Sequence, residues 1–149
     1  MIRLESLQKS FGDHQVLKGI TAVFEPGKVN FIIGKSGEGK SVLARCMVGL
    51  EEVNSGNIFY DQAEFTKMDR WERKHVRKDI GMLFQGAALF DSMTVEENVQ
   101  FPMKMFTTMT AKERADKTEE ILEDVGLIGK NKLYPSELSG GMKKRTGLA

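Results

Sequence analysis

The amino-acid sequence predicts an α/β fold that begins with an antiparallel β part and carries a helical insertion in its second half. Three observations support this prediction. Short apolar runs bounded by turn residues indicate strands, a glycine-rich loop separates one of these runs from a helical segment, and two helix-start signals follow further along the chain. The chain has 149 residues, which is enough for one domain with a core of its own.

The strands are predicted from short apolar runs that end at turn clusters. They run from Ile2 to about Ser10 and over residues 20–24, 29–33, 57–60 and 80–84. The run at 29–33, with sequence VNFII, is rich in β-branched residues and nearly continuous in apolar character. This pattern is typical of a strand that is buried on both faces of a sheet.

Helices are expected wherever apolar residues recur at helical spacing behind a start signal. The first covers about residues 40–48 and stops at Gly49, and an exposed helix is expected over 67–77. Thr94 with Glu97 and Thr110 with Glu113 have the spacing of capping boxes, so each pair predicts a helix start. The last helix is expected to begin near residue 140. These elements divide the chain into an N-terminal core (1–93), a helical subdomain (94–138) and a final segment (139–149).

Composition and charge exclude several classes of function. The net charge is +1, from 22 basic and 21 acidic residues, so no overall basic excess indicates binding to nucleic acid or to an anionic membrane. Cys46 is the single cysteine, which rules out an internal disulfide and fits a reducing cytosol. No apolar run is long enough to span a bilayer, so we expect any contact with a membrane to pass through a partner chain.

Residues 34–41 carry the pattern of a phosphate-binding loop, G-x-x-x-x-G-K-[ST], between a predicted strand and a predicted helix. Glycines let successive backbone N–H groups turn toward phosphate oxygens, and the helix N-terminus adds partial positive charge. The lysine places an ammonium on the β- and γ-phosphates, and the serine hydroxyl binds Mg²⁺. The predicted ATP-binding residues are therefore Gly34, Lys35, Ser36, Gly37, Glu38, Gly39, Lys40 and Ser41, which define a P-loop NTPase core.

A second glycine motif, Leu138-Ser139-Gly140-Gly141-Met142, lies at the start of the last predicted helix. Alone it would be an ordinary helix cap. The order of the phosphate loop, then Leu83-Phe84-Gln85, then LSGG resembles the ATP-binding subunits of ABC transporters over the whole chain. The resemblance implies an ABC ATPase fold in which two copies meet head to tail, so that Ser139, Gly140 and Gly141 of one copy contact the ATP held by the other.

The same resemblance assigns roles to three further residues. It implies that Gln85 is the catalytic Q-loop glutamine, which contacts Mg²⁺ together with Ser41 and acts beside Lys40. Phe11 is implied to stack on adenine, and Val16 is placed with it among the nucleotide-binding residues. Simpler interpretations are a turn hydrophobe for Phe11 and a polar strand end for Gln85. His14 and His75 match no motif and are expected on the surface.

The cargo is predicted from residues around the signature. Met142 replaces the glutamine that most of the superfamily has there, and together with the stretches MLFQGAALF (82–90) and YPSE (134–137) it is similar to the ATPases of Mla-type systems. That similarity implies transport of phospholipid or a related apolar lipid. It also implies a transmembrane permease partner and a cytoplasmic position on the inner face of the cell membrane. An ATPase for another cargo remains an alternative.

The resemblance further indicates that the chain stops before the family's Walker B strand, catalytic glutamate and switch histidine. We therefore expect the 149-residue chain alone to hydrolyse ATP poorly. Three alternatives stay open: a DNA-repair or chromosome-structure ABC ATPase, a ribosome-associated ABC factor, and a nucleotide sensor without turnover. The first would carry long heptad coiled coils between the two motifs, and none is present.

Overall fold

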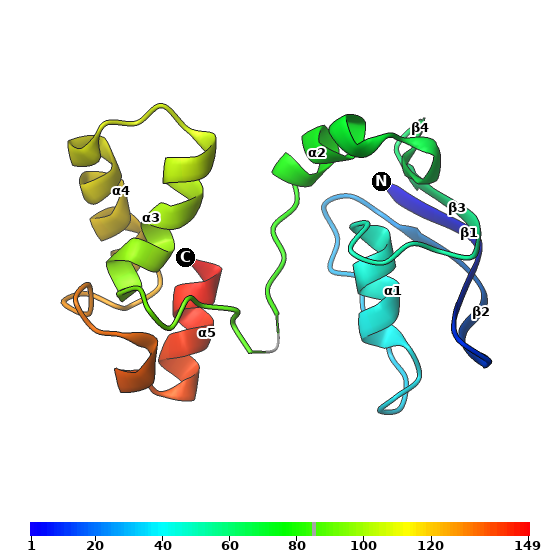
Figure 1. Ribbon diagram of the computed structural model, residues 1–149, viewed down its shortest axis with the longest axis horizontal. Helices are drawn as coiled ribbons and strands as arrows, with labels where there is room; N and C mark the ends of the chain where they lie inside the picture. Colours follow the sequence, from blue (N-terminus) through cyan, green and yellow to red (C-terminus); the bar gives the residue numbers. More distant parts are fainter. Residues whose placement is uncertain (85) are drawn as a thin grey trace. The chain divides into compact units, whose positions relative to one another are not determined.

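The computed structural model describes residues 1–84 and 86–149. It divides the chain into two compact units, Met1–Gly81 and Met82–Ala149 (Figure 1). The first unit holds all four strands, and the second is helical. Each unit is described by itself below.

The first unit is built on an antiparallel sheet with strand order β2-β1-β3-β4. Its strands are β1 (Ile2–Phe11), β2 (His14–Phe24), β3 (Ser55–Tyr60) and β4 (Ala63–Glu64). A tight hairpin joins β1 to β2, with Phe11 paired to His14 and Gly12 at a φ of 55° in the turn. The predicted antiparallel N-terminal part is therefore confirmed, although β2 begins six residues earlier than the apolar run at 20–24 indicated.

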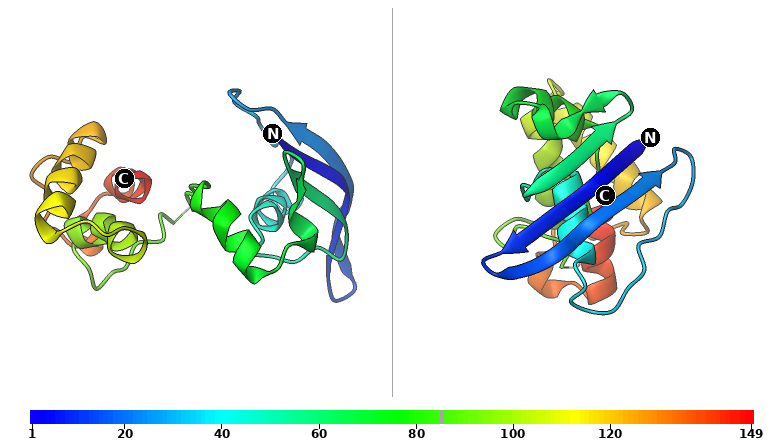
Figure 2. Two further views of the ribbon diagram at one scale, coloured as in Figure 1. Left: turned by 90° about the horizontal axis from the view of Figure 1, so that it is seen from above. Right: turned by 90° about the vertical axis from the view of Figure 1, so that its right-hand side faces the viewer.

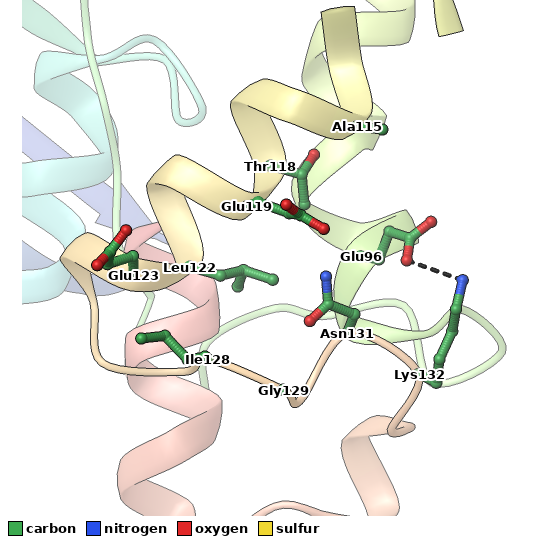
Figure 3. A pocket seen from close by; sticks show the side chains of 10 residues that line it. All are labelled: Glu96, Ala115, Thr118, Glu119, Leu122, Glu123, Ile128, Gly129, Asn131 and Lys132. Atoms are coloured by element: carbon green, nitrogen blue, oxygen red, sulfur yellow. Dashed lines mark hydrogen bonds and ion pairs between the residues drawn. The ribbon is translucent and has the colours of Figure 1, made fainter. Parts of the chain in front are cut away.

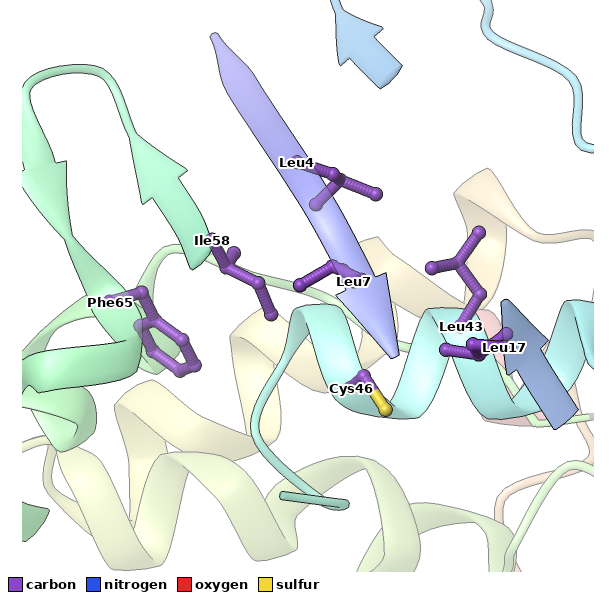
Figure 4. Close-up of a cluster of buried hydrophobic side chains, with 7 residues drawn as sticks. All are labelled: Leu4, Leu7, Leu17, Leu43, Cys46, Ile58 and Phe65. Atoms are coloured by element: carbon purple, nitrogen blue, oxygen red, sulfur yellow. The ribbon is translucent and has the colours of Figure 1, made fainter. Parts of the chain in front are cut away.

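Helix α1 (Lys40–Met47) packs on one face of this sheet, and the strands lie across it in Figure 2. The buried side chains meet between the helix and the strands (Figure 4). They are Leu4, Leu7, Leu17, Leu43, Cys46, Ile58 and Phe65. A 3-10 turn (Phe65–Lys67) contributes Phe65, and helix α2 (Arg70–Lys78) follows it behind an Asp69 capping box.

The buried strand predicted at 29–33 is wrong for this structure. Those residues form neither strand nor helix, and the exposed fractions of Val29, Phe31 and Ile33 are 80%, 81% and 91%. The predicted strand at 80–84 is also absent, with Leu83 at 49% exposure. A strand needs a neighbour that takes up its N–H and C=O groups, and none of the described strands pairs with either segment.

The second unit consists of α3 (Val95–Phe106), α4 (Ala111–Asp124), a 3-10 turn (Pro135–Glu137) and α5 (Gly140–Leu148). Its core is formed by Val95, Val99, Leu122, Leu127 and Leu138. Both predicted capping boxes are confirmed, because Thr94 and Thr110 each accept a hydrogen bond from the glutamate N–H three residues on. Helix α4 ends as predicted at Gly126, which has a φ of 64°.

These capping boxes make the second unit sensitive to acid. The Thr94 N–H and hydroxyl lower the pKa of Glu97, and the same groups of Thr110 lower the pKa of Glu113. A carboxyl whose pKa is lower in the folded than in the unfolded chain stabilises the fold. This contribution is complete above the unfolded pKa, about 4.3, and is lost as the pH falls through the folded pKa.

We expect Glu97→Gln plus Glu113→Gln to make acid unfolding, followed by circular dichroism, less dependent on pH in that window. Glu119→Gln, an exposed change on α4, is the control; an equal effect from it would contradict the prediction.

Within residues 1–84 and 86–149, we find no helix with both the length and the apolar character that crossing a bilayer requires.

Candidate functional site

The phosphate loop connects the irregular segment after β2 to the first turn of α1. Gly37 and Gly39 adopt φ angles of 84° and 87°, in the left-handed region that favours glycine. Gly39 is the N-cap residue, so α1 begins at Lys40 and its N-terminal N–H groups face the loop. The structure thus places the predicted residues 34–41 at a helix N-terminus, as the sequence motif requires.

Gly39 is held against strand β2. A β-carbon at this position would lie 2.7 Å from Val16 Cγ1 and 3.1 Å from Leu17 Cδ2, distances that only glycine avoids. Leu17 belongs to the buried core of this unit. The contact therefore ties the loop to the sheet and brings Val16, one of the predicted nucleotide-binding residues, beside it.

The side chain of Lys40 folds back over the loop. Its Nζ atom donates to the carbonyl oxygens of Gly34 at 2.7 Å and of Lys35 at 2.6 Å. Both bonds are exposed, so a phosphate oxygen can take the place of a carbonyl at the ammonium. Ser41 is exposed as the second residue of α1.

Glu38 supplies an anionic oxygen to the same loop. Its Oε2 atom accepts a hydrogen bond from the Lys35 N–H at 2.7 Å and lies 2.8 Å from the β-carbon position of Gly34. A carboxylate oxygen resembles a phosphate oxygen in charge and in its capacity to accept N–H bonds. The loop therefore has an N–H group directed at an anion, which fits the triphosphate of ATP, and Glu38 competes for that group.

This competition predicts that Glu38→Gln binds MgATP more tightly than the original protein. The change keeps the size of the side chain but removes a negative charge that repels phosphate oxygens a few ångströms away. We expect the dissociation constant, measured by calorimetry, to fall several-fold. Glu113→Gln, which lies in the second unit, serves as the charge-matched control. Unchanged or weaker binding by Glu38→Gln would show that this carboxylate does not compete.

Two cavities bear on where a ligand could bind. One of about 370 Å³ adjoins the loop and is largely apolar; its lining includes Leu17, Ile33, Gly39 and Lys40. A larger one, of about 820 Å³, lies in the second unit between α4 and the 128–132 loop (Figure 3). The Glu96–Lys132 ion pair, at 2.9 Å, borders it. It contains none of the predicted site residues, so the chemistry of the loop decides the site rather than cavity size.

The remaining predicted site residues are Phe11, the signature residues 139–141 and Gln85. Phe11 ends β1 with a ring that is 45% exposed, and the Lys9 ammonium lies 4.8 Å from the ring centroid. Ser139 is the N-cap residue of α5 and accepts from the Met142 N–H at 3.3 Å, with Gly140 and Gly141 exposed beside it. Gln85 lies outside the described residues.

Arg145 connects helix α5, at the start of which the signature residues lie, to the end of α4. The sequence did not indicate this role. Its Nη1 atom donates to the carbonyl oxygens of Val125 at 3.0 Å and Gly126 at 2.8 Å, at the end of α4. A basic residue in the last turn of a helix is an ordinary solvated side chain in most sequences. Only the partners, which lie about twenty positions earlier in the chain, identify this one as an anchor.

A phosphate loop with left-handed glycines, followed by a lysine and a serine at a helix start, defines the class of P-loop nucleotide-binding proteins. The family model described as "ABC transporter" matches residues 17–149. The chain belongs to the ABC transporter ATP-binding family.

Curated relatives match the full length of the chain. It is 42% identical over 149 residues to the methionine import ATP-binding protein MetN of Rhizobium johnstonii, of which it covers 41%. It is 41% identical to the arginine transport ATP-binding protein ArtM of Bacillus subtilis and covers 62% of it. The chain thus spans between two fifths and two thirds of these relatives. Their names do not support the lipid cargo predicted from Met142.

Solved structures agree with this family. Two dimeric structures of the ATP-binding cassette MJ0796, one of them bound to ADP and phosphate, match with TM-scores of 0.89 and 0.88. Both are 28% identical in sequence, and the match covers 99% of this chain and 67% of each cassette. The predicted fold, a P-loop ABC ATPase with an antiparallel β part and a helical region, is confirmed.

Proposed function

We propose that the protein is the ATP-binding subunit of a bacterial ABC transporter and couples the hydrolysis of MgATP to transport. The observation that carries this proposal is the loop at 34–41, where two left-handed glycines and a flexible lysine stand at the N-terminus of α1. Membership of the ABC transporter family supports the coupling to transport.

The residues of the chain would share the work as follows. The loop N–H groups and Lys40 hold the phosphates, and Phe11 and Val16 hold the adenosine part. Ser41 and Gln85 are the residues proposed to contact Mg²⁺. When bound, MgATP supplies the phosphoanhydride bond whose hydrolysis drives the transporter.

A second copy of the chain is proposed to complete the nucleotide site. The glycines of the signature are exposed at the N-terminus of α5, where N–H groups can donate to an anion. The MJ0796 cassettes are dimeric, which supports a dimer here. Ser139, Gly140 and Gly141 of one copy would then contact the ATP that the other copy holds.

The helical subdomain, proposed at 94–138, and the apolar, Met-rich residues of 89–105, which run into it, are the proposed permease-binding part. Of these residues, Val99 and Met103 belong to the core of the second unit, so they support the fold. Phe90 and Met105 are 46% and 61% exposed. The Phe90 backbone is held by Asn98, whose side chain bonds both its N–H and its carbonyl oxygen.

Phe90→Glu is therefore expected to separate ATPase activity from transport. Because the Phe90 side chain is exposed, replacing it with a charged side chain should leave the fold intact. In an apolar contact with a permease helix, the same charge would be buried, which would weaken the contact. In the reconstituted transporter we expect at least tenfold slower transport with basal ATPase activity retained. Leu50→Glu, the same kind of change at an exposed apolar residue of the first unit, is the control. Retained coupling in Phe90→Glu would contradict this placement of the permease.

Two cargoes are proposed, each on its own observation. The MetN and ArtM relatives favour an amino acid, while the resemblance of Met142, residues 82–90 and residues 134–137 to Mla-type ATPases favours an apolar lipid. Met142 packs partly buried against the core of the second unit, where a glutamine would bring an amide to an apolar contact. The test measures ATPase stimulation of the reconstituted transporter by methionine, by arginine and by phospholipid.

The nucleotide site is tested on the full-length protein by calorimetry. We expect saturable binding of ATP that requires Mg²⁺. No heat of binding from a folded sample would overturn the proposal, independently of the cargo.

A further inference from the structure

Helix α2, labelled in Figure 1, carries basic residues along one side and one exposed aromatic residue. Arg70, Lys74 and Lys78 recur at intervals of four residues, so they share one side of the helix. Trp71 stands beside them and is 70% exposed. These four residues are called the α2 patch below.

The two other arginines of the helix, Arg73 and Arg77, contact the rest of the unit. Arg73 donates to the carbonyl oxygens of Phe65 and Thr66 and pairs with Glu52. Arg77 donates to the carbonyl oxygens of Val48 at 2.8 Å and Gly49 at 2.9 Å. These two arginines fasten α2 to its unit, which leaves the charges of the α2 patch directed outward.

The cationic side chains of the patch are not held in ion pairs. Among the described residues, the ion pairs engage neither Arg70, Lys74 nor Lys78. Asp69 and Glu72, at the start of the helix, keep their negative charge but direct carboxylate oxygens at the N–H groups of the capping box. The cationic side chains are therefore available to an external anion.

A hollow of about 480 Å³ lies within this surface, lined by Arg70, Trp71, Lys74 and Arg77. The Lys74 ammonium lies 5.6 Å from the centroid of the Trp71 ring. An indole flanked by ammonium and guanidinium groups matches the boundary of a bilayer, where tryptophan lies at the headgroup level and basic side chains meet phosphate.

We propose that the α2 patch binds the surface of a membrane that contains anionic phospholipid. Trp71 enters the headgroup region, and Arg70, Lys74 and Lys78 pair with the phosphates. This contact adds a direct attachment to the one made through a permease. It needs neither nucleotide nor cargo, so it stands or falls separately from the proposed function.

Nucleic acid fits this patch less well. Binding to a duplex or a single strand uses a basic surface that extends along several elements. Here the basic residues occupy one helix of nine residues, and the exposed aromatic is a single one. A small patch with one exposed indole therefore fits the headgroup surface of a bilayer better than it fits a nucleic acid.

The test is cosedimentation of the full-length protein with vesicles of phosphatidylglycerol and phosphatidylcholine. We expect binding that weakens with salt and is absent with pure phosphatidylcholine. Arg70→Glu plus Lys74→Glu should reduce partitioning at least about thirtyfold, since each basic residue near an anionic surface contributes roughly a fivefold gain. The matched control, Lys112→Glu plus Lys130→Glu, makes the same change of charge in the second unit and should bind as before.

Trp71 provides a second readout, taken as the part of the tryptophan emission that Trp71→Phe removes. Its emission should shift to shorter wavelength with anionic vesicles and remain unchanged with soluble glycerol phosphate. Equal loss in both double variants, equal binding to neutral vesicles, or an unshifted emission would overturn the proposal. So would a preference for duplex DNA over vesicles that depends on the same residues.

Discussion

Gly39→Ala is expected to unfold the first unit at clearly lower denaturant and to abolish tight MgATP binding. The left-handed φ of 87° costs an alanine about 1–2 kcal/mol. The new methyl group would also lie 2.7 Å from Val16 Cγ1, and such overpacking costs about 1–3 kcal/mol more. The loop or β2 must move to relieve the contact, and either movement displaces the phosphate-binding N–H groups.

Gly37→Ala separates the two causes. Gly37 has nearly the same φ, 84°, but a β-carbon there would meet nothing within 4 Å. We expect this variant to lose only the conformational part, about 1–2 kcal/mol, in urea unfolding. If the free energy of unfolding falls equally in both variants, the contact between the loop and Val16 contributes nothing to stability.

Lys40→Ala should leave the stability of the fold nearly unchanged while it removes nucleotide binding. The two hydrogen bonds of the ammonium are exposed and their carbonyl acceptors can bond water instead. Bonds from a charged donor to phosphate contribute about 1.5–3 kcal/mol each, so losing two of them predicts a roughly hundredfold or greater rise in the dissociation constant.

Calorimetry with MgATP checks this result, and urea unfolding of the same samples checks the fold. Lys112→Ala, an exposed lysine near the start of α4, should bind MgATP as the original protein does. MgATP binding by a folded Lys40→Ala variant with unchanged affinity would mean that the loop does not hold the triphosphate.

Local signals in the sequence predicted the parts of the structure that depend on near neighbours. The Thr94 and Thr110 caps and the stop at Gly126 require only residues within one or two helical turns, and all three were found. The phosphate loop is equally local, since glycine positions and the helix start define it. The Gly39–Val16 contact joins different elements and was visible only in the fold.

The two missing strands and the start of β2 show the limit of such patterns. An apolar run at 29–33 indicates a preference for burial, but a strand also needs a partner at hydrogen-bonding distance, which a one-dimensional pattern does not specify. The opposite error occurred in β2, where Lys18 and Gly19 interrupt the apolar alternation although the strand continues past them: Lys18 pairs with Gln8, and Gly19 lies at a register shift. Cross-strand hydrogen bonds there outweigh the weak local preference.

The basic run 73–78 shows a third limit. It belongs to the helix that the sequence predicts as exposed over 67–77, whereas Arg73 and Arg77 point into the unit and only the remaining side chains form a surface. Net charge averages over the whole chain, so a local concentration on one helix leaves it near zero. Which side of α2 packs had to be known before Trp71 and its neighbours could be recognised as a patch.

Because Cys46 is buried between α1 and the sheet, its reaction with a thiol reagent reports when the first unit opens. The thiol lies in the first core at 1% exposure, and burial raises its pKa, so the reactive thiolate is suppressed in the closed fold. Thiol reagents can reach this thiol, the only one in the 149 residues, only when α1 and the sheet separate. The rate of modification therefore counts those separations, without any label having to be introduced.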